Sequence, residues 1–143
     1  MRRPIYLSTQ LDLSFYHLGS YSKERATIYL EQAVDYQFDN GIQVGGSFGF
    51  NAYPGLLAIP LGGQVRFPVL KKRRSDWFIT QSLHKNLPVG NLFYGGNRYR
   101  GELSSILYQN DKLQIIPALG YSFIWDRYGG IALSFNAGLR VTY

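Results

Sequence analysis

The chain has 143 residues, contains no cysteine and carries a formal net charge of +6. A chain of this length fits one domain, and without cysteine it can form neither disulfides nor thiolate metal sites. Its mean hydropathy is −0.15, and it has no run of about 18 consecutive apolar residues, which excludes a membrane-spanning helix.

The positive charge is concentrated in a few places. Four of the fifteen Lys and Arg residues form one run at 71–74, and two more are Arg2 and Arg3. Several others stand between acidic residues and do not line one face, so the sequence does not predict binding of nucleic acid. The run at 71–74 could contact phosphate groups, but it is typical of a solvated turn.

Residues alternate between apolar and polar along the first half of the chain, with the period of two that is typical of β-strands. The expected strands cover residues 5–15, 26–38, 42–51 and 57–69. Asp39, Asn40 and Gly41 predict a tight hairpin turn, because Asn-Gly tolerates the positive φ that such turns need. Pro54 and Gly55 mark the next break.

The second half continues this pattern, with expected strands at 76–83, 99–107, 113–125 and 131–143. A Gly-, Asn- and Tyr-rich stretch at 85–97 is expected to be the longest loop. Eight strands of roughly 9–13 residues are close to the ~9–11 that a tilted strand needs to cross a membrane. Residues 1–143 therefore predict one domain, an all-β, eight-stranded antiparallel up-and-down barrel without free edges.

The alternation of apolar and polar residues does not by itself decide which of the two faces points out of the barrel. A soluble lipocalin-like carrier of an apolar small molecule would be apolar inside, whereas a membrane barrel is apolar outside. Seven charged residues lie well within strands, all on the polar face, as expected if the apolar face meets lipid. The sequence predicts that they form a charge network in the lumen: Asp12, Glu31, Asp35, Arg66, Arg100, Glu102 and Arg140.

Two further patterns favour the membrane barrel. The polar face is rich in Gly, Ala and Ser, as the narrow interior of an eight-stranded barrel requires beside long charged side chains. Aromatic residues gather near the strand ends, where headgroup-level belts are expected. One expected belt is Tyr36, Phe38, Phe67, Trp77, Tyr108 and Tyr143, and the other is Phe15, Phe50, Tyr53, Tyr99, Phe123 and Trp125.

The last strand, residues 131–143, alternates to its final residue and ends on the aromatic Tyr143. In this, and in the block at 57–67, the chain resembles the small bacterial outer-membrane β-barrels of the outer-membrane protein A and X types. The resemblance covers the whole length as a pattern. It implies a barrel in the outer membrane of the Gram-negative envelope, with a carboxy-terminal signal for insertion. The loops are shorter than those of typical adhesins of this kind.

The expected location is the bacterial outer membrane, with an export signal that has been removed from this chain. Outer-membrane lipid is the expected partner, and a protein of the envelope could bind at residues 85–97. The expected role is structural, surface-interacting or that of a subunit in a larger complex, with a plugged lumen that is not an open pore. No cofactor and no metal are expected, since His17 and His84 lie far apart in the sequence.

An outer-membrane lipid hydrolase is the remaining alternative. Ser82 and His84 share one face, and Glu102 on the next strand could orient the imidazole. Two common residues at the strand period carry little specificity, however, and a histidine in water at the barrel rim explains the same pattern. The sequence therefore predicts no enzyme activity and no catalytic residues.

Overall fold

The computed structural model describes residues 4–19, 26–53, 56–72, 75–89, 96–126 and 130–143. Most of them lie in nine strands: β1 (Ile5–Gly19), β2 (Ala26–Gln37), β3 (Gln43–Tyr53), β4 (Leu56–Lys72), β5 (Ser75–Pro88), β6 (Gly96–Ser105), β7 (Tyr108–Gln109), β8 (Gln114–Asp126) and β9 (Ile131–Thr142). These ranges contain no helix of the length and apolarity that a membrane span requires.

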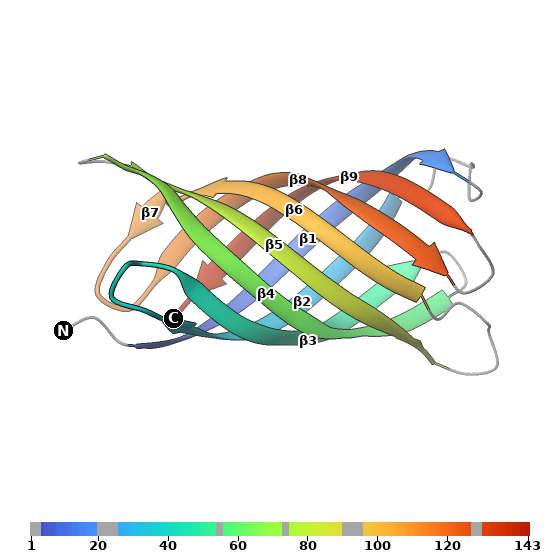
Figure 1. Cartoon of the computed structure of the whole chain (residues 1–143), viewed down its shortest axis with the longest axis horizontal. Helices are drawn as coiled ribbons and strands as arrows, with labels where there is room; N and C mark the ends of the chain where they lie inside the picture. Colours follow the sequence, from blue (N-terminus) through green and yellow to red (C-terminus); the bar gives the residue numbers. More distant parts are fainter. Residues whose placement is uncertain (1–3, 20–25, 54–55, 73–74, 90–95, 127–129) are drawn as a thin grey trace.

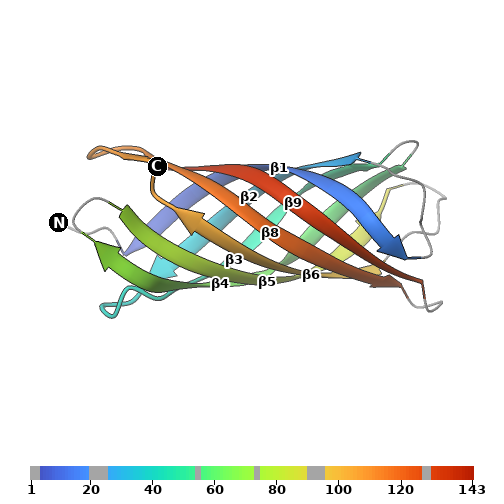
Figure 2. The same cartoon turned by 90° about the horizontal axis from the view of Figure 1, so that it is seen from above.

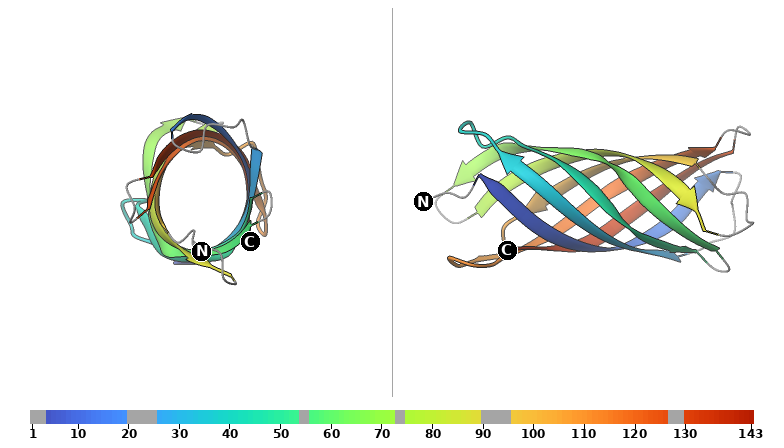
Figure 3. Two further views of the ribbon diagram at one scale, coloured as in Figure 1. Left: turned by 90° about the vertical axis from the view of Figure 1, so that its right-hand side faces the viewer. Right: turned by 90° about the horizontal axis from the view of Figure 1, so that it is seen from below.

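The strands form one closed antiparallel barrel (Figure 1). Each long strand pairs with the strands before and after it, and β6 pairs directly with β8. The ring closes between the two ends of the chain, where Ser8 of β1 pairs with Thr142 of β9. Seen along its axis, the barrel is an unbroken ring (Figure 3). Closure gives every backbone edge a partner.

The two-residue strand β7 belongs to the sixth barrel strand, which a bulge interrupts. Ser104 pairs with Ala118, whereas Tyr108 pairs with Ile115, so the register shifts by one residue in between. The barrel thus has eight principal strands, and the predicted fold class is confirmed.

Two hairpin turns lie at one end of the barrel. The β2–β3 turn is the predicted one: Gly41 has a φ of 87° and its N–H donates to the carbonyl of Phe38 at 2.9 Å. Between β7 and β8, the side chain of Asn110 accepts hydrogen bonds from the backbone N–H groups of Lys112 and Leu113, both at 2.8 Å.

The start of β1 and the end of β9 lie at this same end, which we call the terminal end; the opposite end is the distal end (Figures 1 and 2).

Alternating side chains point into and out of the barrel. In β2, Thr27, Tyr29 and Glu31 are buried, whereas Ile28 and Leu30 between them are 50% and 43% exposed. Apolar side chains cover the outside along every long strand, and the buried set is mostly polar or charged. This arrangement is the reverse of a soluble barrel with an apolar interior, so the lipocalin-like alternative does not fit.

The strands extend further than the sequence predicted. β5 continues to Pro88 and β6 begins at Gly96, so both ends of the expected loop at 85–97 are strand. β4 continues to Lys72, which places the first half of the basic run in a strand. The expected break at 54–55, the residues 73–74 and the middle of the loop, 90–95, lie outside the described residues, as do Arg2 and Arg3.

Candidate functional site: a charged interior within an apolar surface

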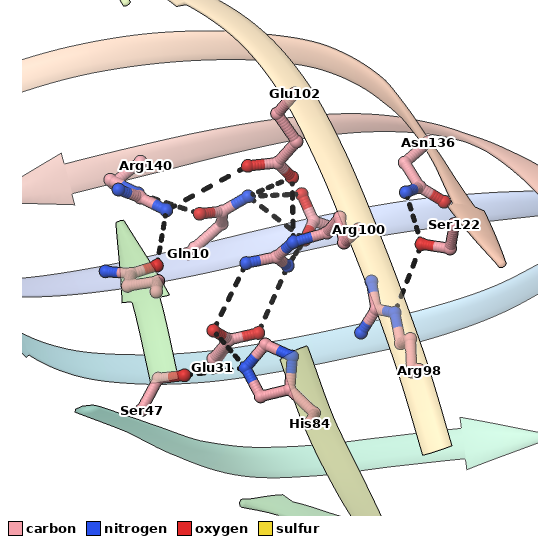
Figure 4. A network of polar contacts seen from close by, with 12 residues as sticks. Gln10, Glu31, Ser47, His84, Arg98, Arg100, Glu102, Ser122, Asn136 and Arg140 are labelled. Atoms are coloured by element: carbon pink, nitrogen blue, oxygen red, sulfur yellow. Dashed lines mark hydrogen bonds and ion pairs between the residues drawn. The ribbon is translucent and has the colours of Figure 1, made fainter. Parts of the chain in front are cut away.

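Arg100 of β6 is the centre of the polar interior (Figure 4). Its Nη1 lies 2.7 Å from Asp12 Oδ2 and 3.1 Å from Glu31 Oε2. Its Nε lies 3.2 Å from Glu102 Oε1. All four residues are at most 4% exposed. A guanidinium group is suited to this position because its five N–H donors can face several carboxylates at once.

A second group of contacts lies towards the terminal end, around Arg140 of β9. The Arg140 Nε donates to Gln10 Oε1 at 2.7 Å, and Nη2 donates to Gln64 Oε1 at 3.2 Å. Gln64 in turn donates to both carboxylate oxygens of Asp35 at 2.8 Å. Gln10 joins the two groups, since its amide donates to Glu102 at 2.8 Å and to Asp12 at 2.9 Å.

Two other arginines lie against aromatic rings inside the barrel. The guanidinium carbon of Arg98 is 3.6 Å from the centroid of the Tyr29 ring, and that of Arg66 is 3.9 Å from the Phe78 centroid. Arg98 also donates to Ser122 at 3.1 Å, and Arg66 to Gln43 at 3.4 Å. A desolvated cation–π contact of this kind is worth about 2 kcal/mol.

Several of these contacts cross the full width of the lumen. In the closed ring, β6 lies opposite β2, and β9 lies opposite β4. Arg98 and Arg100 of β6 reach Tyr29 and Glu31 of β2, while Arg140 of β9 reaches Gln64 of β4. From Arg140 through Arg100 to Arg98, these contacts follow one another along the barrel axis (Figure 4).

The structure places all seven charged residues of the predicted network in the interior. Asp12, Glu31, Arg100 and Glu102 meet as one cluster. Arg140 reaches this cluster directly, with its Nη2 3.9 Å from Glu102 Oε2. Asp35 and Arg140 meet through Gln64, and Arg66 lies on Phe78.

The sequence reasoning missed Gln10, Gln64, His84 and Arg98 as members of the network. Gln10 and Gln64 lie on the same strand face as the charged residues. Their alternate spacing with Asp12 and Arg66 could therefore have predicted that they belong to the network. His84 and Arg98 lie next to or within the stretch that was expected to be a loop.

His84 is 1% exposed and lies deep in the lumen, so its assignment to the barrel rim is wrong. Its Nε2 lies 2.7 Å from Ser47 Oγ and 3.2 Å from Glu31 Oε1. Both contacts use the same ring nitrogen, whereas a catalytic triad needs one nitrogen for the nucleophile and the other for the acid. Ser82 Oγ and His84 Nδ1 have no hydrogen-bond partner among the described residues, so the Ser82–His84–Glu102 arrangement that the hydrolase alternative requires is not formed.

The aromatic residues of both expected belts face outward wherever their side chains are described. On the terminal side, all six are between 37% and 50% exposed: Tyr36, Phe38, Phe67, Trp77, Tyr108 and Tyr143. On the distal side, Phe15, Phe50 and Phe123 are exposed, and Tyr99 and Trp125 are half-buried against neighbouring rings. The side chains of Tyr53 and His17 lie outside the described set.

No group of three or more His, Cys, Asp or Glu that could hold a metal ion occurs among the residues that the structure describes.

No protein-family model matches the sequence, and no curated protein matches it either. Solved structures do share its fold. The crystal structure of Neisserial surface protein A (NspA) has a TM-score of 0.79 and 8% identity, covering 98% of this chain and 96% of that one.

Two other solved barrels are less similar. A de novo designed transmembrane β-barrel has a TM-score of 0.51 and 10% identity over 99% of this chain and 98% of its own. The N-terminal β-barrel domain of Pseudomonas aeruginosa OprF has a TM-score of 0.57 and 7% identity over 96% of this chain and 97% of its own. These likenesses show that the chain has the eight-stranded barrel fold of such proteins.

Proposed function

We propose that the protein is an integral barrel of the bacterial outer membrane, with a plugged polar lumen and a structural or surface-interacting role. The observation that carries this proposal is the inverted distribution of polarity, with charges inside and exposed Leu, Ile, Val and Phe side chains along the outside. A continuous apolar surface of this kind marks contact with a membrane or another apolar partner, and closure lets strands cross lipid without unpaired backbone groups.

The first prediction is insertion into lipid. Protein folded in detergent should give a β-type circular dichroism spectrum and migrate differently on a gel before and after boiling. Trp77 and Trp125 should both be quenched by brominated lipids, because they lie on the outer surface near opposite ends. A monomeric, water-soluble protein that migrates identically in both states would contradict the membrane proposal.

The second prediction is that the lumen does not conduct. Arg98–Tyr29, Arg100–Glu31 and Arg140–Gln64 join opposite walls of the barrel in succession, so an ion would have to displace several paired groups. We therefore expect no steady conductance of small ions in planar bilayers. Steady single-channel currents from the folded protein would reject the plug and leave the membrane location standing.

The third prediction is that the protein is not a lipid hydrolase. His84 contacts Ser47 and Glu31 through one nitrogen inside the barrel, so neither Ser47 nor Ser82 is held by His84 as a nucleophile that faces lipid. Incubation of the folded protein with phospholipid or lipid A should return the lipid unmodified by mass spectrometry. Modified lipid that disappears with Ser82→Ala or Ser47→Ala, but not with the control Thr9→Ala on the outward face of β1, would overturn this assignment.

A further inference from the structure

The outer surface carries an apolar groove towards the distal end, over β5, β6, β8 and β9. Its volume is about 750 Å³, and its lining residues are Leu83, Tyr99, Tyr121, Phe123, Trp125, Ile131 and Leu133. The groove is shallow and open on its outer side, so it suits a ligand that lies along the barrel surface and not one that is enclosed.

The strand register explains how the groove is built. Leu83, Tyr99, Phe123 and Leu133 are cross-strand neighbours and form its floor. In the row towards the terminal end, Gly101 of β6 has no side chain, and the Tyr121 ring leans over it, 3.0 Å from where a Cβ would stand. Tyr121 therefore bounds the groove on this side.

The row towards the distal end carries a charge. It consists of Lys85, Asn97, Trp125 and Ile131, which again are neighbours on adjacent strands. Lys85 is exposed. It is the one charged residue on the outward face of the strands among the side chains that the structure describes. Its Cα lies two residues beyond that of Leu83 in the groove floor, roughly 6.6 Å along the strand.

A lysine on a lipid-facing surface is tolerated only near the interface, where its cost is small and its amine can reach the headgroups. Lys85 shares its row with Trp125, a residue of the distal belt, which fits this level. The surface thus offers an apolar floor and, on its distal side, the Lys85 cation. The apolar floor suits the acyl chain of an anionic lipid, and the cation suits its headgroup.

We propose that this groove binds one anionic phospholipid of the surrounding membrane. An acyl chain lies along Leu83, Tyr99 and Phe123, and the headgroup phosphate pairs with Lys85. This inference rests on the proposed membrane location. A cation near a membrane surface contributes about 1 kcal/mol towards an anionic lipid, which corresponds to about a five-fold preference in occupancy.

The test uses two proteins with one tryptophan each. Trp77→Phe leaves Trp125 in the groove, and Trp125→Phe leaves Trp77 at the terminal end as a matched control. Each is reconstituted in bilayers that contain a small fixed fraction of brominated phosphatidylglycerol or brominated phosphatidylcholine. The readout is the ratio of quenching by the two lipids, with and without Lys85→Gln.

For Trp125 we expect phosphatidylglycerol to be preferred about five-fold, the preference to disappear with Lys85→Gln, and Lys85→Arg to retain it. It should also weaken as salt is added, because the pair is screened. The ratio for Trp77 should be unaffected by Lys85→Gln. A Trp125 ratio that is the same before and after Lys85→Gln would overturn the lipid site.

The other outcomes are distinguishable. If neither lipid quenches either tryptophan, the proposed membrane location itself fails. If both lipids quench Trp77 and neither quenches Trp125, a second copy of this chain covers the groove, and the lipid proposal is rejected.

Discussion

Replacing Arg100 by Met is expected to lower the free energy of unfolding by about 3–5 kcal/mol, the usual cost of removing one partner from a buried ionic cluster. The guanidinium is within 3.2 Å of three buried carboxylates, those of Asp12, Glu31 and Glu102. Without it, three acidic groups remain inside a narrow lumen with too little positive charge nearby. Urea unfolding in lipid vesicles, followed by tryptophan fluorescence, measures the change.

Two variants control this experiment. Lys112→Met removes a cation from the exposed turn between β7 and β8 and should cost no more than about 1 kcal/mol. Glu31→Gln in the Arg100→Met background removes one of the three acidic groups that have lost Arg100 and should recover part of the loss, with a coupling of about 0.5–3 kcal/mol. Equal stability of Arg100→Met and Lys112→Met would mean that water hydrates the carboxylates and that the ionic cluster contributes little.

Gly49→Ala is expected to impair folding far more than Gly46→Ala, although both glycines lie in β3. Gly49 faces inward opposite Glu31, and a Cβ there would run into the Leu30 carbonyl oxygen and stand 2.8 Å from Glu31 Cα. Gly46 faces outward, where the nearest atom to an added Cβ is 3.7 Å away. Backbone atoms of a paired strand move little, so overpacking at Gly49 should cost about 1–3 kcal/mol or more.

The measurement is the fraction of each variant that shows the gel shift of the folded barrel, together with its urea midpoint. We expect Gly46→Ala to stay within about 0.5 kcal/mol of the parent, as exposed substitutions usually do. The folded fraction is informative even if Gly49→Ala fails to fold. Equal folded fractions for the two variants would show that β2 and β3 can move apart at this point.

The fold could be predicted from the sequence, and so could the side chains of each strand that point inward. Both follow from the alternation of apolar and polar residues with a period of two. Once one face is assigned to lipid, every charged residue of the other parity must point inward, which is where Asp12, Arg66 and Arg140 lie. The Asn-Gly turn could be predicted too, since its backbone conformation depends on local residues alone.

The pairing of charges across the lumen could not be predicted in the same way, because it depends on how far each strand slides past the next. The bulges at Tyr16/Leu18 and Pro68/Leu70 change the register between neighbours, and alternation does not reveal them. The distal half of the interior was missed for another reason. The Gly- and Asn-rich composition around 90–97 is typical of a loop. For that reason the sequence did not predict that the side chains of His84 and Arg98 point into the lumen.

The closure of the ring between β1 and β9 has a kinetic consequence. Ser8 and Thr142 are partners although nearly the whole sequence separates them, so this seam is the contact of highest sequence separation in the barrel. Contacts of this kind slow folding, because the entropy of loop closure opposes them before they form. Until the final strand arrives, β1 and β8 present unpaired edges that can pair with other chains. Removal of β9 at the carboxyl end of the chain should therefore leave an open sheet that aggregates. It should not produce a smaller closed barrel.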